Sequence, residues 1–166
     1  MQQPTPDVPL REEWDAAVGR LLAAAAEGEA RLAHLLRVLA GTEGPVAARL
    51  LPQEVPAMAD LARDLLPLAV PEGRLVEDFL RWVHAVARLC ALRATVVHSL
   101  WEVRHDGGRT HMHPSWSRIR EERHPLTAAE LTRTTTALSR VLGAPADELL
   151  LRLDKAAPQL GVFARV

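Results

Sequence analysis

Apolar residues recur every three or four positions from about residue 10 to residue 40, which is the spacing of one buried face of an α-helix. The pattern predicts a single long helix over 10–40, with a bend near Gly28. The stretch "GTEGP" ends this helix, because its glycines and proline supply a stop and a new start. The residues expected to face the core are Trp14, Val18, Leu21, Leu22, Leu32, Leu35, Leu36 and Leu39.

Two shorter helical segments follow. The first is "PVAARLL" at 45–51, and the second is "EVPAMADLARDLLPL" at 54–68. Proline is tolerated in the first turn of a helix, where Pro56 lies, but it interrupts the interior, so Pro67 is expected to close the second segment. The stretch "AVPEG" at 69–73 is then predicted to be a linker.

The most regular helical pattern covers residues 74–102 and carries two neighbouring stripes. One stripe is apolar and contains Arg93 in its register. The other stripe is rich in small side chains, which allow a second helix to approach closely, and it ends at His98. The apolar stripe consists of Phe79, Val83, Val86, Cys90, Val97 and Leu100, and the small-residue stripe of Leu80, His84, Ala87, Ala91, Ala94 and His98.

An irregular segment separates this helix from the C-terminal part of the chain. Gly107 and Gly108 predict a turn, with a short β-ribbon on either side. Thr127 and Glu130 have the spacing of a capping box, which opens a helix running to about residue 142. A last helix begins near Pro145. We therefore expect an all-α bundle of about five to six helices, with an irregular loop or short β-ribbon after the helix at 74–102, a flexible arm at 1–9 and one domain over 10–166.

Composition narrows the classes of function. The chain has 166 residues with 20 basic and 21 acidic side chains, so the whole domain lacks the strongly basic character typical of nucleic-acid binding. Its single cysteine, Cys90, excludes an internal disulfide and lies in the apolar pattern, which favours a buried hydrophobe over a nucleophile. No apolar run resembles a signal peptide or a membrane span, so we expect a cytoplasmic protein without a membrane partner.

Arg93 and His98 are the residues whose chemistry is most suggestive. A cation within an apolar stripe is costly to bury unless it has a partner or faces a cleft, and this stripe offers no acid. The structural interpretation is that the arginine pairs with a carboxylate and the histidine caps the helix. The functional one is metal-independent RNA cleavage, in which the histidine transfers a proton and the arginine stabilises charge on the phosphate. Five residues separate the two by about 140° around a helix, so a second helix or chain is needed to join them.

The stretch "RATVVHSLW" at 93–101 resembles the signature of the HEPN superfamily. That signature is an arginine followed, after four to six residues, by a histidine near the end of a long helix, often as "RNxxxH" before a small residue and an aromatic. The order of elements over 10–145 is also similar. The resemblance implies a homodimer in which the motif residues meet, with ribonuclease activity in toxin or defence systems in many members and a non-catalytic binding or dimerisation role in others. Ala94 departs from the polar residue that nuclease members often carry after the arginine.

The segment after the motif supplies candidate RNA contacts. Arginine forks and an exposed indole suit single-stranded RNA, through phosphate pairing and base stacking. The candidates are Arg104, Arg109, Trp116, Arg118 and Arg120. The alternative is a solvated loop with Trp116 covering the bundle. A zinc site formed by His111 and His113 with His105 or His124 is a further alternative, without any accompanying ligand motif.

The sequence thus favours an HEPN-like endoribonuclease with Arg93 and His98 as catalytic residues, no metal and no cofactor. The expected partners are a second copy of the chain, single-stranded RNA, and an antitoxin or other protein. The alternative function is a non-catalytic dimerisation or adaptor module of the same fold, in which Arg93 and His98 hold the interface together.

Overall fold

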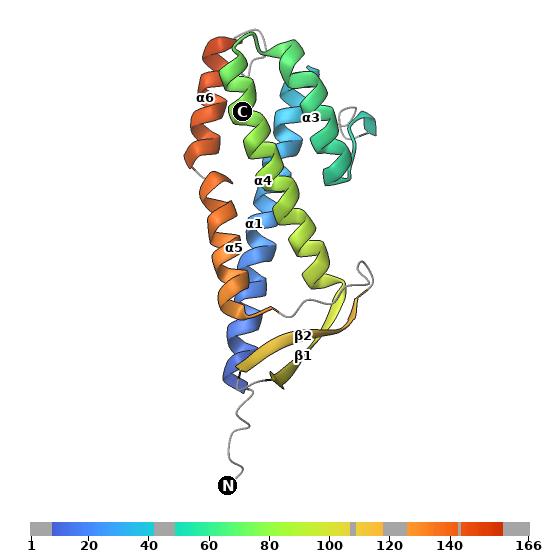
Figure 1. Ribbon diagram of the computed structural model, residues 1–166. Helices are drawn as coiled ribbons and strands as arrows, with labels where there is room; N and C mark the ends of the chain where they lie inside the picture. Colours follow the sequence, from blue (N-terminus) through green and yellow to red (C-terminus); the bar gives the residue numbers. More distant parts are fainter. Residues whose placement is uncertain (1–7, 42–48, 107–108, 118–125, 143, 158–166) are drawn as a thin grey trace.

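The computed structural model describes residues 8–41, 49–106, 109–117, 126–142 and 144–157, except for the side chains of 8, 9, 105, 106, 109–111, 115–117, 144 and 145. Within these ranges the chain is a helical bundle with one two-stranded ribbon, which confirms the all-α prediction. The ribbon lies at one end of an elongated molecule (Figure 1). The expected N-terminal arm and the loop arginines Arg118 and Arg120 lie outside the described residues.

Helix α1 (Val8–Ala40) is the longest element and contacts α3, α4 and α5. Its buried face follows the predicted spacing, although Leu22 is exposed and Val18 is only half-buried. The helix continues unbroken through Gly28. That glycine is buried, and a Cβ there would meet Leu142 at 3.3 Å and Val86 at 3.4 Å. Gly28 therefore lets α4 and α5 approach α1 closely.

Helix α3 (Val55–Ala69) starts with Pro56 in its first turn, as expected. It does not stop at Pro67, which lies inside the helix. A proline near the end of a helix removes one intrahelical bond but leaves the last turn intact, and here the backbone N–H of Val70 still donates to the carbonyl of Leu66 at 3.0 Å. Of the segment expected at 45–51, only the last residues are described, and residues 49 and 50 are helical.

Helix α4 (Gly73–Val97) is shorter than the pattern predicted. Its apolar stripe is buried at Phe79, Val83, Val86 and Cys90, but Val97 and Leu100 are 52% and 64% exposed. Residues 99–102, which were expected to continue the helix, form the start of strand β1 (Ser99–Asp106).

Strand β1 pairs antiparallel with β2 (Arg109–Ser117), which confirms the expected ribbon. Contacts at Trp101 and at Met112 attach the ribbon to the rest of the molecule. The ring of Trp101 packs on that of Trp14 in α1, with 4.7 Å between ring centroids. Met112 of β2 is fully buried, and its backbone bonds to that of Leu126 in both directions at 2.9 Å.

Helices α5 (Ala128–Leu142) and α6 (Ala144–Ala156) follow one another along the side of the bundle (Figure 1). The predicted capping box is present at the start of α5. The backbone N–H of Glu130 donates to Oγ1 of Thr127 at 3.0 Å, and the Thr127 N–H donates to Oε2 of Glu130 at 2.8 Å.

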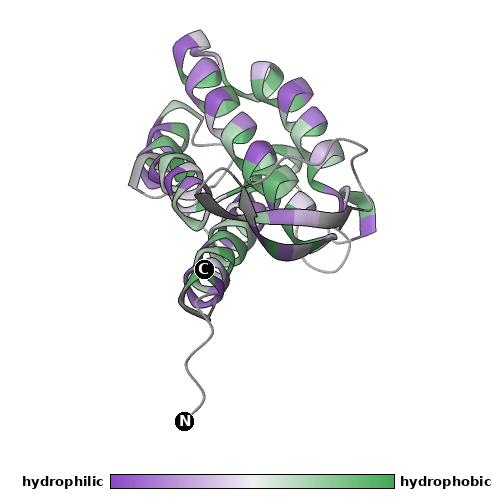
Figure 2. Cartoon of the chain, turned by 60° about the horizontal axis from the view of Figure 1, so that its bottom comes forward, coloured by the Kyte–Doolittle hydropathy of each residue, from purple (hydrophilic) through white to green (hydrophobic). Residues whose placement is uncertain are grey.

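Hydrophobic and hydrophilic residues alternate along each helix (Figure 2). No stretch of the described helices has both the length and the hydropathy of a membrane span.

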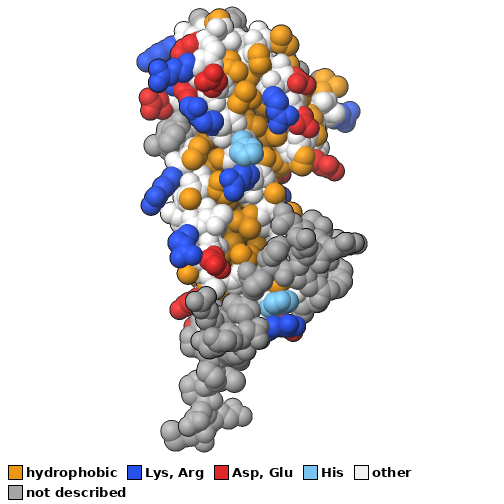
Figure 3. Space-filling view, viewed as in Figure 1, with side chains coloured by type: hydrophobic (Ala, Val, Ile, Leu, Met, Phe, Trp, Pro, Cys, Tyr) orange, Lys and Arg blue, Asp and Glu red, His pale blue; other side chains and the backbone are white. Residues whose placement is uncertain are grey.

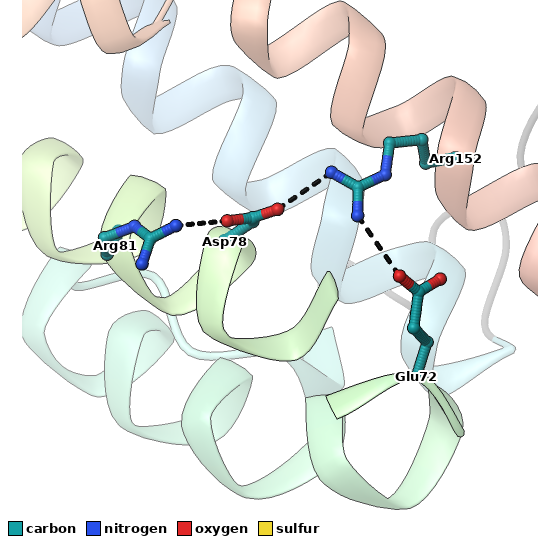
Figure 4. Close-up of polar contacts among 4 residues, drawn as sticks. All are labelled: Glu72, Asp78, Arg81 and Arg152. Atoms are coloured by element: carbon teal, nitrogen blue, oxygen red, sulfur yellow. Dashed lines mark hydrogen bonds and ion pairs between the residues drawn. The ribbon is translucent and has the colours of Figure 1, made fainter. Parts of the chain in front are cut away.

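An ion-pair network joins α6 to α4 (Figure 4). The Arg152 guanidinium donates to Oδ2 of Asp78 at 2.8 Å and pairs with Oε1 of Glu72 at 3.3 Å, while Arg81 pairs with the other oxygen of Asp78. The hydrogen bond from Arg152 lowers the pKa of Asp78. The network therefore fixes the charged state of a side chain that is only 19% exposed.

Candidate functional site

The residues that follow Arg93 cap the C-terminal end of α4 by donating hydrogen bonds to its last carbonyls. The last carbonyls of a helix have no partner within it and must find one elsewhere. Here the His98 backbone N–H donates to the Ala94 carbonyl at 3.0 Å, and the hydroxyl of Ser99 donates to the Thr95 carbonyl at 2.7 Å. The indole of Trp101 donates to the carbonyl of Val96 at 2.9 Å.

These hydrogen bonds give a structural role to Ser99 and Trp101, which follow the motif histidine His98. Ser99 and Trp101 end α4, and Trp101 also fastens the ribbon to Trp14. The side chain of His98 is left exposed at the C-cap position, where the backbone has left the helix with φ −94° and ψ 17°. An exposed imidazole at this position is open to solvent and to any partner that approaches the end of α4.

Arg93 has the acidic partner that its own stripe does not supply. Its guanidinium Nη1 donates to Oε2 of Glu29 in α1 at 2.9 Å, and each side chain is 34% exposed. Glu29 follows Gly28, at the point where α1 and α4 approach closely. The sequence analysis missed Glu29. The sequence feature that could have pointed to Glu29 is its position beside Gly28 in a run of alanines. Such a stretch predicts a close contact between helices, but it does not identify Arg93 as the partner of the carboxylate.

Arg93 and His98 do not converge within one chain. Five residues along the helix amount to about 7–8 Å of rise and about 140° of rotation. Arg93 reaches toward α1, while His98 lies exposed beyond the last turn of α4. The structure describes one copy of the chain, so the shared site expected across two copies stays a prediction.

The small-residue stripe of α4, here called the α4 seam, is open to solvent. His84, Ala91 and His98 are exposed, and Leu80, Ala87 and Ala94 are half-buried. Hydrophobic side chains gather along the front of the molecule, where α4 lies, with most charged side chains to either side (Figure 3). The three alanines of this face would allow another helix to pack closely against it.

The ribbon places the candidate RNA contacts at different distances from His98. Trp116 is paired with Leu100, two residues beyond the histidine. Arg104 and Arg109 lie toward the far end of the ribbon, so that Arg104 is about 20 Å along β1 from His98. The Arg104 guanidinium is also engaged, since its Nε donates to Oε1 of Glu102 at 2.9 Å. The side chains of Arg109 and Trp116 are outside the described set.

Cys90 has the environment of a core residue. It is 6% exposed, its thiol lies 3.8 Å from the carbonyl of Ala25, and burial raises its pKa. A thiol that resists ionisation is a poor nucleophile, which agrees with the prediction from the sequence.

The described side chains include no group of three or more metal-ligating residues placed as a metal site would need. The zinc alternative involves His105, His111 and His124, whose side chains are not described, so it is not tested by this observation. Of the four loop histidines, only His113 has a described side chain, and it is half-buried.

No protein-family model, curated protein or solved structure matches the chain. The resemblance to the HEPN superfamily therefore rests on the motif at 93–101 and the order of the elements.

Proposed function

We propose that the chain forms a homodimer through the α4 seam and that the dimer is an HEPN-like, metal-independent endoribonuclease. The observation that carries the proposal is the exposure of His98 at the end of an uncovered helix face of small residues, one and a half turns beyond a half-exposed Arg93. If the two seams pack in parallel about a twofold axis, the two His98 side chains lie at the same end of the interface, and each Arg93 lies about one and a half turns earlier on its own helix.

The chemistry requires only these side chains and the RNA itself. One imidazole takes the proton of a ribose 2′-hydroxyl, whose oxygen then attacks the adjacent phosphorus. The bond from phosphorus to the 5′-oxygen breaks, and the leaving oxygen takes a proton from the imidazolium of the other copy. Arg93 donates hydrogen bonds to the phosphate oxygens as charge builds on them. The products are a 2′,3′-cyclic phosphate and a 5′-hydroxyl.

The dimer is tested by measuring the mass in solution of the native chain and of Ala91→Glu. Ala91 is exposed, so glutamate there leaves the monomer intact but buries two like charges in a packed seam. The native chain should be a dimer and Ala91→Glu a monomer. The matched control is Ala129→Glu on the exposed face of α5, which should remain dimeric. A native monomer, or a dimer that Ala91→Glu does not weaken, would contradict the seam interface.

RNA cleavage is tested in EDTA with a labelled single-stranded RNA, its 2′-O-methyl form and the DNA of the same sequence. Only the unmodified RNA should be cut, because the other two lack a free 2′-hydroxyl. His98→Ala should lower the rate by about 100-fold or more, the usual worth of a general acid–base group, while His84→Ala serves as a control on the same seam. Intact RNA, or equal cutting by His98→Ala, would refute the nuclease.

A second function, a non-catalytic dimerisation or adaptor module, is favoured by the contact between Arg93 and Glu29. A guanidinium already held by a carboxylate is less available to a phosphate and stabilises the packing of α1 on α4. A dimer that leaves RNA intact would support this function. Arg93→Gln would then lower the free energy of unfolding, and neither the native chain nor the variant would cleave RNA.

A further inference from the structure

A pocket of about 460 Å³ lies beside the C-terminal half of α1. One wall is α1, through Ala30, Ala33 and Leu36, and the other is the segment before α3 together with its first turn, through Leu51 and Met58. Small-molecule sites commonly have volumes of about 300–1,000 Å³ and apolar walls with a few polar groups. The pocket has the size and the walls of such a site.

Of the described residues, two charged side chains line this pocket, Glu29 and Arg37, and they differ in whether they already have an ion-pair partner. Glu29 lines it, but its carboxylate is already paired with the guanidinium of Arg93. Arg37 lines it as well, and its exposed guanidinium has no hydrogen bond or ion pair with any other described residue. Burial lowers the pKa of the neighbouring His34, and the positive charge of Arg37 lowers it further. With Glu29 paired to Arg93, Arg37 is the cation of this pocket that has no ion-pair partner among the described residues.

We propose that this pocket binds a small amphipathic monocarboxylate. Its apolar body would lie between α1 and Leu51, and its carboxylate would accept hydrogen bonds from the Arg37 guanidinium, whose planar fork matches the two carboxylate oxygens. Among the described lining residues Arg37 supplies the one guanidinium, which matches a monoanion better than a more highly charged ligand. The proposal does not require the dimer or RNA cleavage, although Glu29 links the pocket to Arg93.

The first test compares three probes of equal chain length by calorimetric titration, namely octanoate, octanamide and octylammonium. Octanoate should bind about two- to fivefold more tightly than octanamide, the range expected for one exposed charge pair, and octylammonium should bind most weakly. The preference for octanoate should shrink at high salt. No binding of octanoate, equal affinity for the acid and the amide, or tightest binding of the amine would each overturn the proposal.

Two variants separate the charge from the cavity. Arg37→Gln should abolish the preference for octanoate over octanamide while both still bind, and Arg133→Gln on the exposed face of α5 is the matched control. Ala30→Leu should fill the pocket and lower the affinity for both probes. Ala30 is exposed on a helix where leucine is well tolerated, and unfolding by urea verifies that each variant is folded. Unchanged affinities in Ala30→Leu would locate any binding elsewhere and refute the pocket.

Discussion

Gly28 shows how a single residue without a side chain decides the packing of three helices. A Cβ added at Gly28 would lie 3.3 Å from Leu142 of α5, which is tighter than most real Cβ contacts, and 3.4 Å from Val86 of α4. The sequence pattern placed a bend at this glycine, because glycine is a poor helix former. The structure shows that two other helices approach α1 closely at Gly28, a tertiary contact that leaves no signature in the spacing of α1.

A comparison of Gly28→Leu with Gly19→Leu tests this role. Gly19 is exposed and has nothing within 4 Å of a Cβ, so leucine there should raise the free energy of unfolding by about 0.5–1 kcal/mol through helix propensity. Gly28→Leu should lower it by about 1–3 kcal/mol, because the added side chain overpacks a filled core. Urea unfolding measures both values. Stabilisation by both substitutions would show that the contact at Gly28 is not restrictive.

Arg93 illustrates what residue patterns reveal about a candidate site. Its place in an apolar stripe predicted that it needs a partner, and the structure supplies Glu29 at 2.9 Å. The identity of that partner could not be predicted, since it depends on how α1 and α4 align across 64 residues of chain. The joint role of Arg93 and His98 stays a prediction, because it depends on a second copy.

Among the elements, the start of α5 was predicted correctly and the end of α4 was not. The start of α5 carries its own chemistry in Thr127 and Glu130, and the bonds are those of a capping box. The end of α4 was placed five residues too late, because Val97 and Leu100 continue the helical spacing and no glycine or proline intervenes. The deciding contact is the packing of Trp101 on Trp14, which are distant in sequence.

The capping box of α5 should be worth a measurable part of the stability. Thr127→Ala removes the hydroxyl that accepts from the Glu130 N–H and should lower the free energy of unfolding by about 1 kcal/mol. Thr134→Ala is the matched control, since Thr134 is exposed in the middle of the same helix, where alanine is the better helix former. If urea unfolding gives the same change for the two variants, the cap contributes nothing specific.

At the scale of the whole molecule, the bundle is held together by charged contacts between helices as well as by its apolar core. Arg31 of α1 pairs with Asp147 of α6 at 2.5 Å, and Arg152 of α6 pairs with Asp78 and Glu72 beside the start of α4. Hydrophobic spacing predicted which helices form and which face each buries. It could not predict these pairs, because any exposed arginine can meet any carboxylate until the helices are docked.

The ion-pair network around Asp78 makes the free energy of unfolding depend on pH in the acidic range. Because the hydrogen bond from Arg152 lowers the pKa of Asp78 below its ordinary 3.8, the folded chain binds this proton less readily than the unfolded chain does. The contribution to stability is therefore fully present above that ordinary value and is lost as the pH falls through the lowered pKa. Urea unfolding between about pH 5 and pH 2 should show a steeper loss of stability in the native chain than in Asp78→Asn.

The control for this pH dependence is Asp60→Asn. Asp60 pairs with Arg63 within a single helix, and both side chains are mostly exposed, so its loss should leave the acid dependence close to that of the native chain. Arg152→Gln removes the donor and should reproduce the shallower curve of Asp78→Asn, because an unpaired Asp78 titrates nearer its ordinary pKa. Parallel acid curves for the native chain and both network variants would mean that the docking of α6 on α4 does not depend on the charge of Asp78.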